Sequence, residues 1–333
     1  MIGTDELARE IAKSSDIRDV QTYVHKEQID GSTHILSIIR PVKFPERLRP
    51  LLNALSTAHA GILEVNAIDA TLGEALVAFS SAGIHTGLAV IRPQQGTWID
   101  EDQVKALFKQ AGLSDWTFMD MDGIGLRTKL LQYAQRMKPM LDALDDEPLV
   151  LPIDQHFNVK GIGLVAIGYV QCGHLKVHDE LTLLPAKGSG TVKSLQVMDD
   201  DVEIAHAGDR VGIALRNTKE EHLSGDTIIV HPLIDDKKTG THKPLAVAGH
   251  LRSTVELTQS PFQKRVLVEG DVIHASVDLQ FVVGRVKHAQ APVFEIEWEH
   301  PLYIRVANPQ PALITQLDSK PRILGHATIN LLE

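Results

Sequence analysis

The first 147 residues alternate between two kinds of hydrophobic pattern. Apolar residues recur at helical spacing in several segments, 5–13, 45–59, 71–82, 100–112 and 126–144. Between them lie short, nearly continuous apolar runs at 34–40, 61–65, 87–91 and 116–119. Such runs are typical of strands that are buried on both faces of a parallel sheet. The alternation therefore predicts a doubly wound α/β domain over residues 1–147.

The pattern changes after the acidic stretch 142–147, which we interpret as a linker. From 148 to 233, short alternating segments are separated by glycines, and this spacing predicts a small closed β-barrel. The polar segment 234–243 is expected to be a second linker. Residues 243–333 are again strand-rich, with strands expected at 246–252, 264–268, 272–277, 294–298, 302–306 and 323–329. The predicted fold class is α/β plus all-β, a doubly wound domain followed by two β-barrel domains.

Composition narrows the possible partners. The 333 residues contain 33 Lys and Arg against 43 Asp and Glu, a formal charge of −10. Because clustered Lys and Arg hold nucleic acids, this balance argues against DNA as a partner and against RNA binding by bulk charge alone. The single cysteine, Cys172, excludes an intramolecular disulfide and a four-cysteine zinc site. No long apolar run or apolar leader occurs, so we expect a cytoplasmic protein without a membrane partner.

A chain of motifs follows in residues 151–229. D-Q-H-F-N-V-K-G-I-G spans 154–163, V-K-S-L-Q spans 192–196 and A-H-A-G-D-R-V-G spans 205–212. Their order resembles the second domain of the translation GTPases of the elongation factor Tu, elongation factor 1-alpha and SelB group. One departure is His178, which stands where the family pattern V-G-D-E-L has glycine.

The sequence is most similar to a SelB-like branch of methanogenic archaea, which has a weakened nucleotide loop and was once proposed as a pyrrolysine-linked elongation factor. The resemblance implies a degenerate P-loop GTPase-like α/β domain at 1–147. It also implies barrels like elongation factor domains 2 and 3 at 148–233 and 243–333. For the third domain the resemblance depends mainly on position and on Gly325-His326-Ala327.

The phosphate-binding loop of this family is largely replaced. Such a loop needs Gly-x-x-x-x-Gly-Lys-Ser/Thr, because backbone N–H groups and the lysine hold the phosphates while the hydroxyl binds magnesium. Here only Gly3 is kept, and Ala8, Arg9 and Glu10 take the other positions. Glu10 would set a carboxylate against a phosphate.

The other nucleotide motifs are also missing. By register, Arg40 replaces the metal-linked Asp of the second motif, while Lys43 and Phe44 replace its glycine and histidine. Arg92-Pro93-Gln94-Gln95 stands where the base-reading Asn-Lys-x-Asp should follow the strand at 87–91. We therefore expect no GTP binding, no cofactor and no catalytic residue.

The second domain offers one candidate binding surface. In the active family this domain holds the aminoacyl end of a tRNA, and the matching rim here would include Gln196, His206 and Arg210. The alternative is that Arg210 and Asp209 simply pair at a barrel corner. The acidic run 199–201 beside the rim would repel a phosphate backbone.

A second candidate surface is the basic cluster of Arg40, Lys43, Arg47 and Arg49. It could hold an RNA phosphate, or it could be an ordinary solvated face. The histidines lack the spacing of a metal site, so no metal is expected. Cys172 precedes Gly173 in an expected β-turn, and we expect it to be inert.

Three functions stay open. The first is a translation-factor relative that has lost GTP and binds tRNA, the ribosome or a protein through its barrels. The second is a protein-binding scaffold or assembly factor in methanogen-specific metabolism, which the charge of −10 favours. The third is an active GTP-dependent elongation factor, which needs the motifs that are missing here.

Overall fold

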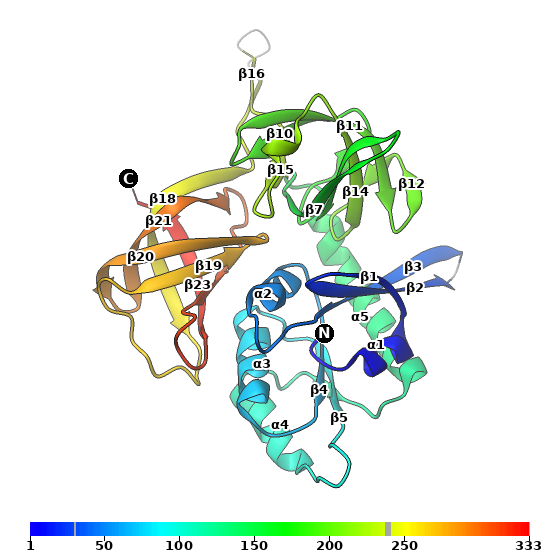
Figure 1. The fold of residues 1–333 in the computed structure, drawn as a ribbon, viewed down its shortest axis with the longest axis vertical. Helices are drawn as coiled ribbons and strands as arrows, with labels where there is room; N and C mark the ends of the chain where they lie inside the picture. The colour runs from blue at the N-terminus through cyan, green and yellow to red at the C-terminus, as the bar shows by residue number, and fades with distance from the viewer. Residues whose placement is uncertain (30, 237–240, 333) are drawn as a thin grey trace. The chain divides into compact units, whose positions relative to one another are not determined.

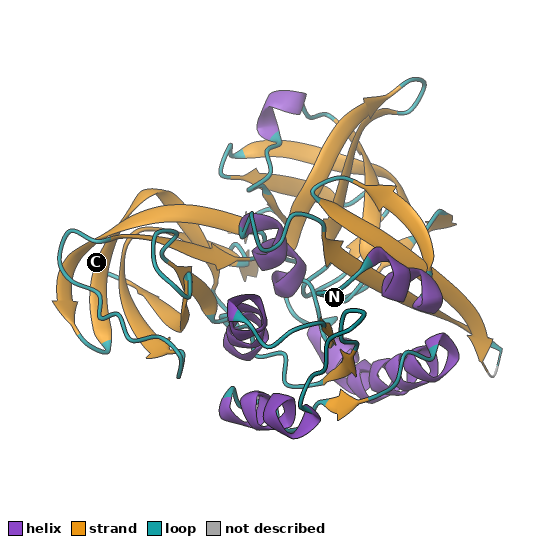
Figure 2. Cartoon of the chain, turned by 60° about the horizontal axis from the view of Figure 1, so that its bottom comes forward, coloured by secondary structure: helices purple, strands orange, loops and turns teal. Residues whose placement is uncertain are grey.

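The computed structural model describes residues 1–29, 31–236 and 241–332. The chain divides into two compact units, Met1–Met137 with Leu257–Leu267 and Leu313–Ala327, and Lys138–Glu256 with Val268–Ala312 and Thr328–Glu333. The predicted class, an α/β region followed by two closed β-barrels, is confirmed (Figure 1). The α-helices come from the first 144 residues, and strands form the barrels (Figure 2).

The α/β region contains the predicted helices with shifted ends. They are α1 (Asp5–Ile11), α2 (Arg49–Ser56), α3 (Ala70–Ser81), α4 (Glu101–Gln110) and α5 (Gly123–Leu144). Asp69 and Asp100 begin α3 and α4, because each carboxylate accepts a hydrogen bond from a backbone N–H in the first turn. Gly83 follows α3 with φ +70°, a left-handed conformation that favours glycine and ends the helix.

The strand expected at 34–40 was assigned to the wrong kind of sheet. β1 (Lys13–Ile17), β2 (Val20–Ile29) and β3 (Ser32–Pro41) form an antiparallel sheet, and β3 is not buried on both faces, since Ile38 is buried and Ser37 is exposed. A separate parallel sheet is formed by β4 (Gly61–Val65), β5 (Gly87–Ile91) and β6 (Thr117–Phe118). β1 and β2 were not predicted, because their sequence is largely polar.

The second-domain barrel closes as predicted. Its ring is β10 (Glu180–Leu184), β15 (Ile228–Val230), β7 (Leu151–Val159), β8 (Gly163–Tyr169), β14 (Arg210–Arg216) and β11 (Gly188–Val197), closed by pairing of β10 with β11. Short strands accompany it: β12 (Asp200–Val202) on β11, and β9 (Leu175–Lys176) with β13 (Ile204–Ala205). A 3₁₀ turn, η1, covers Glu220–His222.

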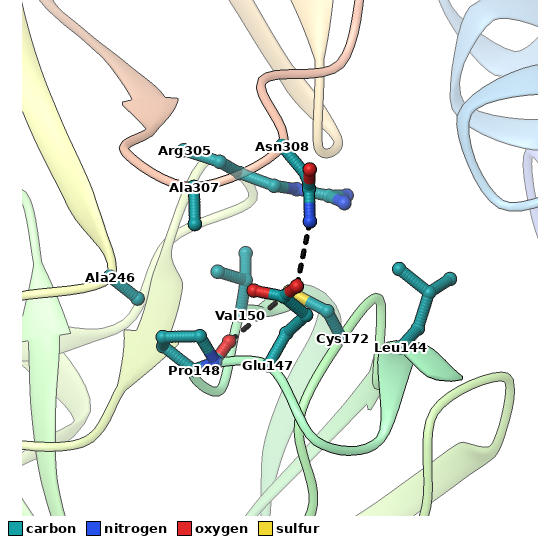
Figure 3. Close-up of a pocket in the computed structure, with 9 residues that line it drawn as sticks. All are labelled: Leu144, Glu147, Pro148, Val150, Cys172, Ala246, Arg305, Ala307 and Asn308. Atoms are coloured by element: carbon teal, nitrogen blue, oxygen red, sulfur yellow. Dashed lines mark hydrogen bonds between the residues drawn. The ribbon is translucent and has the colours of Figure 1, made fainter. Parts of the chain in front are cut away.

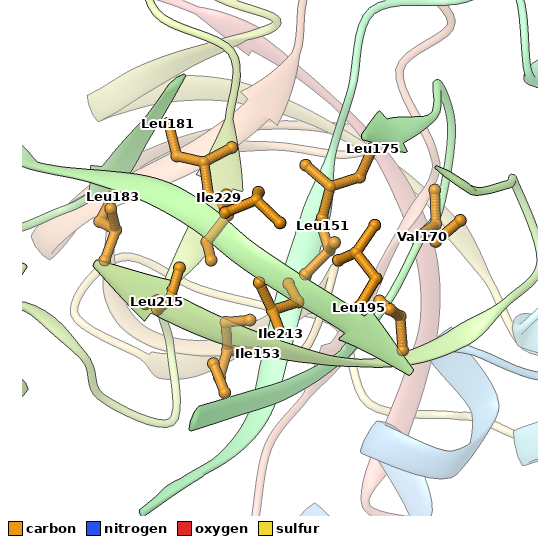
Figure 4. Packing of buried hydrophobic residues seen from close by; sticks show 14 of the residues in the cluster. Leu151, Ile153, Val170, Leu175, Leu181, Leu183, Leu195, Ile213, Leu215 and Ile229 are labelled. Atoms are coloured by element: carbon orange, nitrogen blue, oxygen red, sulfur yellow. The ribbon is translucent and has the colours of Figure 1, made fainter. Parts of the chain in front are cut away.

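Alternate apolar residues of these strands meet inside the barrel (Figure 4). Leu181 and Leu183 come from β10, and Ile213 and Leu215 from β14. Each fully buried side chain of this kind contributes about 1.5–3 kcal/mol. The period-two pattern in the sequence therefore determines which face of each strand enters the core.

The expected linker at 234–243 contains two paired strands, β16 (Ile234–Asp236) and β17 (Thr241–Lys243). Residues 237–240 of that linker lie outside the described residues. Within the part of the chain that the structure describes, no helix combines the length and apolar character that a membrane crossing requires.

The last barrel has the strand order β18-β21-β20-β19-β22-β23. Its strands are β18 (Val247–Gln259), β19 (Val272–Val277), β20 (Gln280–Gln290), β21 (Val293–Arg305), β22 (Ala312–Thr315) and β23 (Ile323–Leu331). The strands predicted at 294–298 and 302–306 are one continuous strand. The strand predicted at 264–268 is wrong, because the Gln259 amide group binds the carbonyls of Gln263 and Arg265 in an irregular segment.

Candidate functional site

Gly3 and Thr4 directly precede α1, and hydrogen bonds hold both ends of this helix. Thr4 Oγ1 accepts from the backbone N–H of Leu7 at 3.3 Å and caps the N-terminus. The Arg127 guanidinium donates to two carbonyl oxygens in the last turn, at 2.8 and 3.1 Å. Close packing against α5 requires a glycine, since a Cβ atom at Gly123 would lie 2.3 Å from Glu10 O. Helix α1 is thus held at both of its ends.

Of the four positions that the sequence assigned to a nucleotide loop, only Gly3 precedes α1, whereas Ala8, Arg9 and Glu10 lie within this helix. Ala8 is fully buried in the core of the α/β region. Arg9, at the position of the family's lysine, pairs with Asp5 at 2.6 Å. Glu10 is exposed, and the carbonyl of Gly3 accepts a hydrogen bond from the Arg40 side chain at 2.7 Å.

A buried carboxylate lies at the start of α1. The Glu64 side chain, from β4, has no exposed surface, and its Oε2 accepts a hydrogen bond from the backbone N–H of Thr4 at 2.6 Å. A Cβ atom at Gly3 would lie 2.9 Å from the Cβ of Glu64, so the glycine permits this close approach. In an active phosphate-binding loop, backbone N–H groups of this kind face the phosphates. Here an internal anion uses one of them.

Arg92 neutralises this carboxylate. Arg92 follows β5, and its guanidinium lies 3.4 Å from Glu64 Oε1 and 2.7 Å from Glu6 Oε2. Arg92 belongs to the segment that replaces the base-reading motif, whereas Glu64 was not among the residues predicted to be functional. The available signal was the single charged residue inside the apolar run G-I-L-E-V, because a buried carboxylate needs a hydrogen-bonded partner.

The members of the basic cluster have different surroundings. Arg40 donates to Gly3 O and, at 3.2 Å, to Gln21 Oε1, so its guanidinium is engaged with the loop. Lys43 lies 3.5 Å from Asp19. Arg47 and Arg49 are exposed at the turn that leads into α2.

The barrel-rim residues are each held by a different neighbour. Gln196 donates to Asp201 at 2.9 Å across the β11–β12 pair. His206 lies 2.9 Å from the carboxylate of Asp145. Burial tends to raise the pKa of Asp145, but its hydrogen bonds to His206 and the Ala207 N–H outweigh burial and lower it. His206 thus contacts Asp145 of the acidic stretch 142–147.

Arg210 lies over the ring of Tyr169 on the paired strand, 6.0 Å from the ring centroid. Its Nε and Nη2 are buried and have no hydrogen-bond partner among the described residues. Burial raises the pKa of Tyr169 to about 12. Asp209, the alternative partner of Arg210, accepts from the backbone N–H of His206 at 2.8 Å instead.

Cys172 lines a small cavity of about 10 Å³ with Glu147, Arg305 and Asn308 (Figure 3). This volume is about that of one water. The thiol donates to Pro148 O at 3.2 Å, and burial raises its pKa to about 11. At neutral pH the thiol is protonated, which agrees with an inert cysteine.

Comparison with known proteins identifies relatives of two kinds. The family model of elongation factor Tu domain 2 matches residues 163–229. An uncharacterised protein of Methanocaldococcus jannaschii is 26% identical over 276 residues, 83% of this chain and 81% of that protein. The selenocysteine-specific elongation factor of the same organism is 39% identical over 107 residues, 31% of this chain but only 22% of that protein.

Two solved structures share the fold. One is the elongation factor SelB of Methanococcus maripaludis in complex with the GTP analogue GppNHp. The match has a TM-score of 0.74 and 19% sequence identity, and it covers 98% of this chain and 76% of the SelB chain. A bacterial selenocysteine-specific elongation factor matches 97% of this chain and 55% of its own with a TM-score of 0.75 and 16% identity.

Proposed function

We propose that this chain is a SelB-like relative of the translation elongation factors that binds tRNA or the ribosome without binding GTP; the domain 2 match, the similarity to a selenocysteine-specific elongation factor and the SelB-like fold support this. One observation carries the loss of GTP. The buried carboxylate of Glu64 accepts the Thr4 N–H at 2.6 Å, where a phosphate oxygen would otherwise be bound. Two anions cannot share this donor, because like charges a few ångströms apart repel strongly inside a protein.

The residues around the loop support the same proposal. Arg9 is paired with Asp5 and Glu10 carries no hydroxyl for magnesium, so neither replaces the family's Lys-Ser/Thr. After β5, Pro93 has no N–H to donate, and no Asp is present in 92–95 to accept from guanine.

Titration calorimetry with GTP and GDP in the presence of magnesium tests the loss of nucleotide. We expect no saturable heat at high micromolar concentration, while a GTP-binding elongation factor measured alongside gives a normal isotherm. A dissociation constant below about 10 µM, on the order of −7 kcal/mol, would overturn the proposal and favour an active GTP-dependent factor.

Gel shifts with bulk tRNA and purified ribosomes at about 150 mM salt test the partner. We propose that Arg40, Lys43, Arg47 and Arg49 supply the phosphate contacts, so the log–log slope against salt should be about −0.7 to −0.9 for each phosphate neutralised. Arg47→Glu is the cleanest variant, because Arg40 and Lys43 also have internal partners. Arg136→Glu, on the exposed side of α5, is the matched control.

On the barrel rim, Gln196, His206 and Arg210 are proposed to contact the aminoacyl end. Arg210→Ala should then weaken the binding of aminoacylated tRNA only. If RNA binding is undetectable at this salt, the protein-binding scaffold becomes the better reading, and the charge of −10 favours that alternative.

A further inference from the structure

An open cavity of about 360 Å³ lies at the carboxyl ends of β4 and β5. It is formed by the loop 66–68, the loop 94–100 and the first turn of α4. In open parallel sheets, ligands bind in the crevice outside the carboxyl ends of the strands. The volume is within the range of small-ligand sites. Gly3, Ala8, Arg9 and Glu10 do not line it, whereas Gln94, from the segment that replaces the base-reading motif, does.

Trp98 is the prominent side chain of this cavity. It is 79% exposed, whereas Trp116 and Trp298 are only 4% and 3% exposed. Tryptophan is frequent among the residues that dominate binding interfaces. A large aromatic side chain that is left in solvent beside a cavity is therefore a candidate contact for a partner.

The loop that carries Trp98 is held by its own hydrogen bonds. Thr97 donates twice to the carbonyl of Gln94, from its backbone N–H at 2.9 Å and from its hydroxyl at 2.7 Å. On the other side, Ile99 is buried and Asp100 caps α4 by accepting from the N–H of Asp102 at 3.0 Å. Because the loop is already ordered in this way, it loses less conformational entropy when a partner binds.

The chemistry around Trp98 favours a cation. Asp100 lines the cavity, and Asp69, Glu101 and Asp102 neighbour its lining residues in the sequence. Residues 66–70 and 93–104 contain no Lys or Arg, and Arg92 is paired with Glu6 and Glu64. The nearest lysine in sequence, Lys105, pairs with Glu101 at 2.6 Å. The amides of Asn66 and Gln103 add uncharged acceptors to the lining.

We propose that this cavity binds an arginine side chain of a protein partner, with the guanidinium on the ring of Trp98. A planar guanidinium stacks on aromatic rings and presents five N–H donors, which carboxylate and amide oxygens such as those of Asp100 and Asn66 can accept. An RNA phosphate would instead be repelled by the carboxylate of Asp100, the charged side chain in the lining. The inference does not depend on the proposed function: of the residues used there, the lining contains only Gln94, and the inference holds whether or not RNA also binds.

Indole N–H signals of the full chain, labelled with ¹⁵N-tryptophan, test this inference. The three tryptophans give three signals, and the signal that disappears in Trp98→Ala belongs to Trp98. The probe is a capped hexapeptide of alternating Gly and Arg, titrated to millimolar concentration at about 150 mM salt. We expect a saturable shift of the Trp98 signal and none of the buried Trp116 and Trp298.

Three variants and a second peptide test how the cavity binds the arginine peptide. Asp100→Asn removes the charge but keeps a good helix cap, so it should lower the affinity for the arginine peptide severalfold without unfolding α4. Trp98→Ala should lower this affinity about tenfold in calorimetry, equivalent to about 1.4 kcal/mol. The corresponding Gly-Lys peptide should bind more weakly than the Gly-Arg peptide. Leu251→Ala, at an exposed apolar residue of β18, should change nothing.

The inference is wrong if the Trp98 signal does not saturate with the arginine peptide, or if Asp100→Asn and Trp98→Ala bind it as the parent does. It is equally wrong if oligouridylate shifts the Trp98 signal and the peptide does not, because the cavity would then accept a nucleobase.

Discussion

Replacing Glu64 with alanine should destabilise the α/β region, and the loss should be concentrated at the start of α1. The substitution removes a fully buried carboxylate and leaves the Thr4 N–H without its 2.6 Å acceptor. It also removes one of the two carboxylates that hold Arg92. Glu64→Gln keeps the shape and one acceptor oxygen, so it separates the effect of charge from that of the hydrogen bond.

The expected loss follows from these contacts. An unpaired buried donor costs about 1–3 kcal/mol, and the removed methylene adds about 0.8 kcal/mol. The ion pair adds at most about 1 kcal/mol, because the Arg92 side chain is 36% exposed and keeps Glu6. We therefore expect about 3 kcal/mol for Glu64→Ala and about 1 kcal/mol for Glu64→Gln.

Native-state hydrogen exchange measures this loss where it occurs. The Thr4 and Leu7 amides report the opening of α1 independently of the barrels, since exchange follows local as well as global unfolding. Glu6→Ala is the matched control, because the Glu6 side chain is 62% exposed and contacts the same arginine. It should change protection by less than about 0.5 kcal/mol.

Two results would refute this reasoning. If Glu64→Ala leaves the Thr4 amide as protected as in the parent, the carboxylate is not what holds the loop. If Glu6→Ala costs as much as Glu64→Ala, burial is not the source of the difference.

Three further predictions concern the barrels. His178 has φ +77°, so His178→Gly should raise the free energy of unfolding by about 0.5 kcal/mol in urea titrations; a loss of stability would contradict this. Residues 148–233 should fold alone, because the barrel closes within that span, and amide signals without dispersion would contradict it. His250 is buried, and burial lowers its pKa below 6.5. As the pH falls, the unfolded chain therefore binds a proton at this histidine before the folded chain does, so the free energy of unfolding should decline below about pH 6.5. His250→Gln should flatten that slope, and an unchanged slope would assign it to other groups.

The sequence determined the elements whose side chains alternate or recur regularly. Leu181 and Leu183 point inward because successive residues of a strand face opposite sides, and this local period does not depend on distant segments. The departure from the family pattern at 178 was visible in the sequence, but the left-handed conformation of His178 was seen only in the structure. The order of domains follows from the same local patterns.

Only the tertiary structure decided which distant groups meet. Glu64 reaches the N–H of Thr4 across 60 residues of chain, and Arg40 reaches Gly3 across 37. Neither pairing has a periodicity that a sequence could display, because a buried charge is satisfied by whichever donor the fold brings near it. For the same reason the polar strand β2 was missed: its partner β3, and not its own composition, makes it a strand.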